Sequence, residues 1–546
     1  MKLRIALSLG LFAFGAIAAE NRTVKAESGG ELRITLASEP KSLHPLLVNE
    51  ESGEVVRYLT TGVLIRLNRL SQKPQPELAE SWKVSDQGKR ITFELKQNLK
   101  FSDGTPFDSA DVVFTVDKML DKNLHSPLAE SFQAAGKVTA KANNSKSVTI
   151  QFESYIAGIE RLFDNVSIIS SRSPKKEAAV LGAFMVVESK SGSYLRLGRN
   201  PYFWKRDSSG RQLPYLDSIR IEFQRNRDLE LIRFQKDELD IVSNLEPESF
   251  NKLKAKLEVT ALDLGTSLDT VQVWFNQVEA SPIAAHKKEW FKSSAFRLAI
   301  SESINRQDMA RVVYLGYGAP AAGMISPANF NWVSKQVQAP DFQPKQALAR
   351  LVKAGFRYDN GVLIDKSNHP VEFTIVTNAG NKVRERLAAM MQADLKQIGI
   401  KVQIAALDFP SLIERIMRSF NYEACLLGMV NLDLDPSSMM NVWLSSGSNH
   451  AWNPNQKTPA TSWEAEIDKL MRQQATEIDA KKRKVAFDRV QAIVAREAPI
   501  LFLVNKHSLA AASTKLRNIK PTILIPQMLW NIEEVYFAQG ALRASK

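Results

Sequence analysis

Patterns typical of β-strands alternate with patterns typical of helices along most of this chain, and this alternation limits the folds open to it. In ELRITLA (31–37) and ITFELK (91–96), apolar residues stand at every second position, as in a half-buried strand. In 109–120 and 343–354, apolar residues recur at the spacing of one helix face. We predict further strands at 147–152, 219–223, 371–376 and 401–406, and further helices at 228–237, 293–304, 381–398, 410–418 and 463–495, the last with an interruption. The alternation predicts an α/β protein.

The length of 546 residues is too great for a single hydrophobic core, so we expect two or three domains. Hydrophobic residues make up 44% of the chain and charged residues 24%, which is the composition of a globular protein and not of a disordered or fibrous one.

The first residues have the pattern of an export signal. Lys2 and Arg4 precede an apolar run at 5–19, and Ala16, Ala18 and Ala19 supply the small residues of a cleavage site. We therefore predict a signal peptide at 1–19 and a mature protein in the periplasm. The cleavage region has no cysteine for lipid attachment, and no later apolar run reaches about eighteen residues, so we predict a freely soluble product.

Cysteine usage and charge exclude some classes of function. Cys425 is the one cysteine, so no intramolecular disulfide can form, and its apolar surroundings predict a packed strand residue. The formal charge is +13, but basic residues are interspersed with acidic ones. We interpret the cluster KKRK (481–484) as a solvated helix face and predict no nucleic-acid partner. The positive excess could still attract an anionic ligand or a membrane partner.

The stretch FSDGTPFDSADVVFTVDKML (101–120) contains several residues that fix the backbone conformation and no obvious catalytic group. Asp103-Gly104 and Pro106 predict a tight turn, and Asp108 predicts a helix cap that accepts a hydrogen bond from the N–H of Asp111. An apolar stripe follows the cap. We interpret this stretch as scaffold.

Motifs of catalysis and of metal or cofactor binding are missing. The chain has no GxSxG elbow and no P-loop, and its six histidines are scattered without metal-ligand spacing. We predict that the protein is not an enzyme, has no cofactor and has no direct metal ligands. His450, in SSGSNHAWNP, leaves open a site that contacts a chelated metal.

Several segments in a fixed order resemble one known family. FSDGTPFDSADVVFTVDKM resembles the signature segment of the family 5 extracellular solute-binding proteins of ABC transporters, the dipeptide- and oligopeptide-binding group. PELAESWKVSDQGKRITFELKQNLKFSDG matches its lead-in, and GAFMVVESKSGSYLRLGRNPYFWKR resembles its glycine-led strand and Asn-Pro-Tyr turn. VWFNQ, PKQALARLVKAGF and MMQADLKQIGIKVQI continue the order. The resemblance covers roughly residues 30 to 535.

The resemblance implies a two-lobed α/β clamshell of the periplasmic-binding-protein type II, with an extra subdomain in the first lobe and a ligand cleft between the lobes. We place the first part of lobe I at 20–50, the inserted subdomain at 51–170 and the second part of lobe I at 171–268. Lobe II would follow at 269–500, and 501–546 would return to lobe I. The expected crossings are near 269–277 and 498–508.

The same comparison implies a ligand-binding loop in CLLGMVNLDLDPSS (425–438). In peptide-binding relatives an acidic residue just before an Asp-Pro turn holds the ligand's ammonium group. Asp435-Pro436 keeps the turn, but the anchoring position falls on Leu432, with Asp433 next to it on the opposite face of a strand. We predict that this loop contributes Gly428, Met429, Val430, Asn431, Leu432 and Asp433 to the site.

Five other polar residues are candidate ligand contacts. Ser38 and Glu39 end the first strand, where ligands of open α/β sheets bind, although they could form a solvated turn. Arg384 and Arg386 begin the helix at 381–398 and could bind a ligand carboxylate, or could be solvated cations. Asn276 lies on a predicted crossing strand and could offer its amide.

These predictions support a receptor that delivers a small ligand, by preference an oligopeptide, to an ABC permease in the inner membrane. We expect a monomer whose closure around the ligand is the signal that the permease reads. Two alternatives stay open: a receptor for a sugar derivative, an opine-like compound or a metal chelate, and a periplasmic sensor or chaperone-like protein without a transport role.

Overall fold

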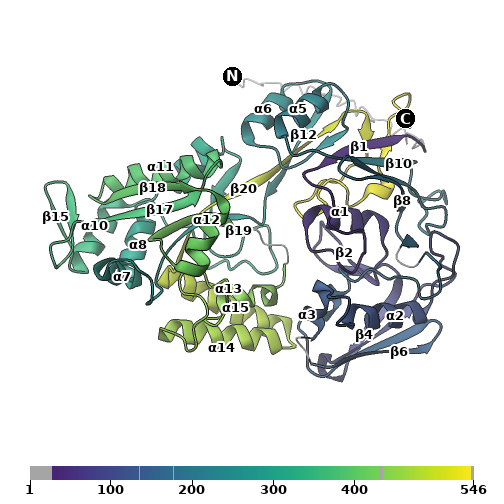
Figure 1. Cartoon of the computed structure of the whole chain (residues 1–546), viewed down its shortest axis with the longest axis horizontal. Helices are drawn as coiled ribbons and strands as arrows, with labels where there is room; N and C mark the ends of the chain where they lie inside the picture. The colour runs from purple at the N-terminus through teal and green to yellow at the C-terminus, as the bar shows by residue number, and fades with distance from the viewer. Residues whose placement is uncertain (1–27, 134–135, 176–177, 430–433, 543–546) are drawn as a thin grey trace, which may run out of the picture.

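The computed structural model describes residues 28–133, 136–175, 178–429 and 434–542. Two lobes lie side by side and are joined by strands at the top of the view (Figure 1). Lobe I holds both ends of the described chain, and lobe II is formed by its middle. The predicted two-lobed α/β fold is confirmed.

Lobe I is built on a four-stranded sheet with the order β1-β10-β9-β8. β1 (Glu31–Leu36) runs parallel to β10 (Ser218–Phe223), and the pairs of β10 with β9 (Tyr194–Arg199) and of β9 with β8 (Phe184–Lys190) are antiparallel. Its hydrophobic core also takes residues from α1 (Glu51–Thr60) and from the C-terminal segment 510–537. Segments far apart in sequence thus share this core.

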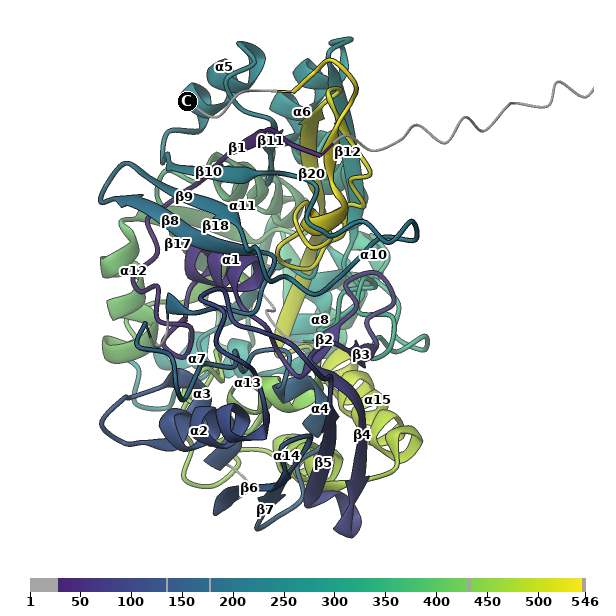
Figure 2. The ribbon, with the colours of Figure 1, turned by 90° about the vertical axis from the view of Figure 1, so that its right-hand side faces the viewer.

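A second core in the same half of the molecule belongs to the inserted segment. Four antiparallel strands form its sheet in the order β4 (Ala79–Ser85), β5 (Arg90–Leu95), β7 (Ser147–Phe152) and β6 (Val138–Asn144). α2 (Ser109–Leu120) packs on this sheet, and α3 (Pro127–Gln133) and α4 (Ile159–Leu162) complete the unit. α1 and the short strands β2 (Ile65–Leu67) and β3 (Pro74–Pro76) lie between the two sheets (Figure 2).

The mixed sheet of lobe II continues through β20 toward lobe I. Its strand order is β11-β20-β13-β19-β17-β18, β12 and β14 also pair with β20, and β11 and β12 lie at the lobe I end. The strands are β11 (Ile241–Val242), β12 (Val259–Thr266), β13 (Thr270–Phe275), β14 (Gly318–Pro320), β17 (Glu372–Asn378), β18 (Lys401–Leu407), β19 (Ala424–Met429) and β20 (Ile500–Ser513). The principal helices are α8 (Ser294–Glu302), α10 (Pro344–Lys353), α11 (Lys382–Lys396), α12 (Phe409–Glu414), α14 (Ser462–Thr476) and α15 (Ala480–Glu497). Cys425 is fully buried in β19, as predicted.

β20 belongs to both lobes. Its first half pairs with β13 in lobe II, and its second half pairs with β11 and β12 beside lobe I. Twelve of its fourteen residues are buried, and only Lys506 and His507 are more accessible, at the point where the strand passes between the lobes. The buried Asn505 donates to Asp269 O (3.1 Å) and Thr270 Oγ1 (2.8 Å), which ties β20 to the neighbouring crossing segment.

The turn and cap predicted in 101–120 are present. The Asp108 side chain accepts hydrogen bonds from the N–H of Asp111, as predicted, and from the N–H of Ala110 (2.8 Å). The Asp111 carboxylate accepts one in return from the N–H of Asp108 (2.9 Å), which completes a capping box. Arg172 binds both carboxylates, at 2.9 and 3.0 Å. The stretch therefore fixes the start of α2.

Among the described residues, no helix is both long enough and apolar enough to cross a membrane.

The substitution Asp108→Ala should lower the free energy of unfolding by about 1 kcal/mol, because it removes the helix cap. Asp117→Ala, on the exposed face of the same helix, should change it by less than about 0.5 kcal/mol. Thermal unfolding followed by circular dichroism would compare the two variants, and equal midpoints would contradict the structural role given to Asp108.

Candidate ligand-binding cleft between the lobes

A cavity of about 660 Å³ lies between the lobes. Lobe I contributes residues of α1 and the loop before it, together with Arg69 and Asp164, and lobe II contributes Tyr314 and Leu434. The crossing segments supply its floor at 267–269 and 506–509. Its volume is within the range of small-molecule sites, and both lobes and both crossing segments contribute lining residues.

The lobes contact each other beside this cavity. Gln72 of lobe I donates its side-chain amide to Ala328 O of lobe II at 2.8 Å. Leu268, Leu434 and Leu524 form a small buried apolar cluster that joins a crossing segment, lobe II and the C-terminal segment. The two lobes are therefore in direct contact beside the cavity.

One wall of the cavity is acidic. Glu51, in the first turn of α1, and Asp269 of the crossing segment both line the cavity and repel each other electrostatically. Burial within the cleft raises the pKa of Glu51, and the negative charges of Asp269 and Glu50 raise this pKa further. Lys506, which also lines the cavity, forms an ion pair with Asp269 at 3.4 Å and offsets part of this repulsion. Glu51 makes no ion pair among the described residues, so its carboxylate can bind an ammonium group of a ligand.

Arg384 is a positive group near the cavity, although it is not one of the lining residues. Its Nη1 donates to Asn378 Oδ1 at 2.6 Å, and among the described residues its guanidinium makes no ion pair. Burial lowers the pKa of Arg384, although Tyr314 and Asp269, which line the cavity, are close enough to counteract this shift. The side chain also lies in the first turn of α11, where the helix dipole disfavours a cation. A ligand carboxylate would compensate for these costs.

Gly428 makes room for this arginine. A Cβ atom at position 428 would lie 2.6 Å from Arg384 Nη2, which is too close for any side chain without a shift. Met429, the last residue of β19, pairs in register with Thr270 at the start of β13. Gly428 and Met429 thus lie on the strand that leads to the cleft, and Val430, Asn431, Leu432 and Asp433 lie outside the described residues.

The remaining predicted contacts lie away from the cavity. Arg386 forms an ion pair with Glu248 of α6 (Pro247–Lys254) at 3.0 Å, and both side chains are about half exposed. Asn276 is fully buried, and its amide donates to Phe420 O and Tyr422 O (both 2.8 Å). Ser38 contacts Ser52 Oγ, and Glu39 accepts a hydrogen bond from the N–H of Gly192. In this structure these four residues make contacts within the protein itself.

The predicted absence of a metal site remains a prediction, but the position of His450 is clear. His450 is buried between Val442 O (3.0 Å) and Glu464 Oε1 (3.2 Å) and contacts the tilted ring of Trp452, so it does not face the cleft. Within the described parts of the chain, no three His, Cys, Asp or Glu side chains are grouped to bind a metal ion.

Comparison with known proteins agrees with this architecture. The family described as bacterial extracellular solute-binding proteins, family 5 middle, matches residues 73–451. The chain belongs to this family. Its sequence is 26% identical to that of the oligopeptide-binding protein AppA of Bacillus subtilis, with 94% of this chain and 93% of AppA covered.

Solved structures of low sequence identity share the fold. The substrate-binding protein CtaP of Listeria monocytogenes superposes with a TM-score of 0.79 at 22% identity, over 94% of this chain and all of CtaP. NikA of Brucella suis, in complex with Fe(III)-EDTA, gives a TM-score of 0.78 at 18% identity, over 93% of this chain and all of NikA. AppA in complex with a nonapeptide gives 0.70 at 23% identity, over 94% of this chain and all of AppA.

In this family 5 solute-binding protein, a buried ion pair anchors the turn after the predicted ligand loop. Arg483 binds both oxygens of the Asp435 carboxylate, at 2.7 and 3.1 Å, and its Nε donates to Gln474 O at 2.8 Å. The interpretation of 481–484 as a solvated face was therefore wrong for Arg483, which is 5% exposed. Its neighbours Lys481 and Lys482 are exposed. The ion pair fixes Asp435-Pro436 against α15 beside the cleft.

The substitution Arg483→Gln should destabilise lobe II by about 3 kcal/mol, because it leaves the Asp435 carboxylate buried without its cation. Lys482→Gln removes a neighbouring positive charge that is exposed, and it should change the stability by less than about 0.5 kcal/mol. Urea unfolding monitored by tryptophan fluorescence would measure both. Equal unfolding midpoints for the two variants would show that the Arg483–Asp435 contact contributes little.

Sequence reasoning missed the acidic wall. Glu51 and Asp269 are separated by more than two hundred residues, and only the crossing of the chain between the lobes brings them together. A weak signal was available, since Glu50, Glu51 and Glu54 gather at the start of a predicted domain and Asp269 begins a predicted crossing. The pairing itself required the fold.

Proposed function

We propose that this protein is the ligand-binding component of an ABC importer and holds an oligopeptide in the cleft between its lobes. The observation that carries this proposal is the 660 Å³ cavity, to which both lobes and both crossing segments contribute. A ligand that contacts both lobes stabilises the closed form, and that form is presented to the permease in the inner membrane. The protein acts as a monomer and performs no chemical reaction on its cargo.

The charges around the cleft support a peptide as the ligand. Glu51 and Asp269 can bind a terminal ammonium group, and Arg384 can bind a terminal carboxylate. A peptide with free ends carries these two groups at a distance from each other. The sequence similarity to AppA, an oligopeptide-binding protein, supports the same assignment.

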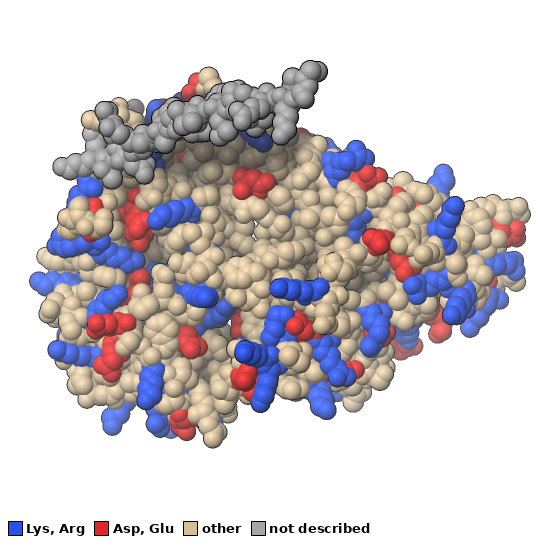
Figure 3. Space-filling model, turned by 180° about the vertical axis from the view of Figure 1, so that it is seen from behind, with Lys and Arg blue, Asp and Glu red and all other residues tan. Residues whose placement is uncertain are grey.

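The surface charge bears on the kind of partner, and the N-terminal sequence supports a periplasmic location. Lysine and arginine side chains are interspersed with acidic ones on the face shown in Figure 3, which does not favour a nucleic-acid partner. The basic start, apolar run and small residues of 1–19 direct the chain to export, and the mature protein then meets its ligand in the periplasm.

Native mass spectrometry of the protein isolated from its own periplasm would test the assignment. We expect adducts that denaturation releases as a mixture of short peptides with free ends, since the cavity recognises termini and not one side chain. A single non-peptide compound, such as an opine-like molecule or a metal chelate, would contradict the peptide assignment.

A matched pair of variants on α11 would locate the carboxylate anchor. For the most abundant released peptide, Arg384→Gln should raise Kd by at least about tenfold, because a hydrogen bond to a charged group is lost. Arg386→Gln removes only an exposed ion pair and should change Kd by less than about fivefold.

The C-terminal amide of the same peptide completes this test. It lacks the carboxylate, so its Kd, measured by calorimetry, should be nearly equal for the native protein and Arg384→Gln. Equal effects of the two substitutions on the free peptide, or an undiminished Arg384→Gln effect on the amide, would remove Arg384 from the site.

A further inference from the structure

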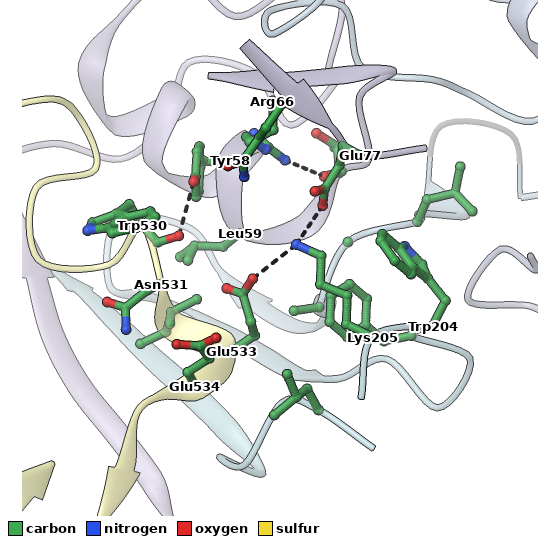
Figure 4. A pocket seen from close by; sticks show the side chains of 18 of the residues that line it. Tyr58, Leu59, Arg66, Glu77, Trp204, Lys205, Trp530, Asn531, Glu533 and Glu534 are labelled. Carbon is green, nitrogen blue, oxygen red and sulfur yellow. Dashed lines mark hydrogen bonds and ion pairs between the residues drawn. The ribbon is translucent and has the colours of Figure 1, made fainter. Parts of the chain in front are cut away.

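A second cavity, of about 470 Å³, lies within lobe I and shares no lining residue with the cleft. It is enclosed by the second half of α1, by β2 and β3, by the loop at 203–206 and by the C-terminal segment at 530–534 (Figure 4). It therefore lies where the inserted segment, the second part of lobe I and the end of the chain meet. Interfaces between structural units are common places for ligand sites.

One lining residue, Arg66, is poorly satisfied. Its side chain is 8% exposed, and the hydrogen bond that it makes among the described residues is a long one of 3.5 Å, from Nη2 to Thr61 O. Nη1 has no hydrogen-bond partner and lies 3.8 Å from Asp164 Oδ1. Asp164 already binds Arg69 at 2.7 Å. Because a guanidinium has five N–H donors and buried donors are normally paired, Arg66 calls for an additional anionic acceptor.

Two carboxylates lie elsewhere in the cavity and share one ammonium group. Lys205 Nζ binds the carboxylates of Glu77 (2.8 Å) and Glu533 (3.1 Å), so one ammonium group serves two carboxylates. Both carboxylates point at Lys205 in the cavity (Figure 4). The positive charges of Arg66 and Lys96 also act on Glu77. Among the described residues, however, only Lys205 forms an ion pair with either carboxylate, so a ligand ammonium group can bind beside Lys205.

Aromatic side chains line the space around these charges. The Tyr58 ring has the Arg66 guanidinium over its face at 4.2 Å, and the hydroxyl donates to Trp530 O at 3.0 Å. Trp204, which is half-buried, has Lys96 Nζ over its ring at 4.0 Å and Lys205 Nζ at 5.4 Å from its ring centre, so a ligand ring would use the rest of its surface. Together with Leu59 and Leu213, these rings can accept a flat hydrocarbon group.

We propose that this cavity, which we name the rear cavity, binds a free aromatic α-amino acid as a zwitterion. The carboxylate of the ligand binds Arg66, its ammonium group lies against Glu533 and Glu77, and its ring packs on Trp204. A neutral hydrocarbon would leave both charges unpaired, and a simple anion or cation would satisfy one of them. This site is separate from the cleft, with which it shares no lining residue.

Titration of the full-length protein with 4-fluoro-L-phenylalanine, followed by ¹⁹F NMR, would test the rear cavity. We expect saturable binding below about 10 mM. Two analogues that each lack one charged group, 3-phenylpropionate and phenethylamine, should bind at least about tenfold more weakly, because each leaves one cavity charge unpaired.

Variants would locate the binding. Glu533→Gln should weaken binding at least about tenfold, whereas Glu534→Gln, at the adjacent position and paired with Lys520, should leave it within about twofold. Trp204→Leu should also weaken binding, and Arg384→Gln in the cleft should not. Trp204→Leu keeps the test valid if a charge variant fails to fold, as judged by its thermal unfolding midpoint.

Three results would overturn the proposal: no saturable binding of the probe, equal binding of the zwitterion and of both analogues, or binding that Arg384→Gln abolishes and Trp204→Leu leaves unchanged. The last result would place the probe in the cleft. None of these results bears on whether peptides are released from the native protein, so the proposed peptide function is tested separately.

Discussion

The backbone pairing of β20 with strands of both lobes is the constraint on which the rest of the structure depends. A strand that is buried on both faces needs apolar residues along its length, and β20 has them except at Lys506 and His507. Register shifts lie on both sides of this point, between Val271 and Gln272 and between Asp263 and Thr266. Because such bulges bend a strand and increase its twist, the two lobes face each other across a cleft and do not extend one flat sheet. The ligand cavity exists because of this bend.

Local sequence signals predicted the secondary structure well where the pattern was strong and the partners were near. α2 and β7 have the predicted bounds, and α11 and β17 differ from theirs by no more than two residues at either end. The segment near 498–508 was expected to be a crossing, but its continuation to Ser513 was not, because AAAS has little strand character of its own. Pairing with β11 and β12 makes that segment a strand.

The candidate site was harder to predict, because the roles of its residues depend on contacts between distant segments. Arg384 and Arg386 are two positions apart on one helix and look equivalent in the sequence. The fold places Arg384 beside Gly428 and the cleft, and it pairs Arg386 with Glu248 of another helix. Arg483 stands in a run of four cations, and only the fold turns this one inward to Asp435. In each case the residue type suggested a possible role, but the sequence did not show which way the side chain points.

Burial of charge links the cleft to the rear cavity. Asp164 lines the cleft and lies between Arg69, which also lines the cleft, and Arg66, which lines the rear cavity. Tyr58 places its ring against both guanidinium groups, at 4.2 and 5.1 Å, so one carboxylate and one aromatic ring serve two cations. The desolvation cost of such a cluster is large unless every charge is compensated. Occupancy of either cavity by a charged group therefore changes the electrostatic balance of the wall that both cavities share.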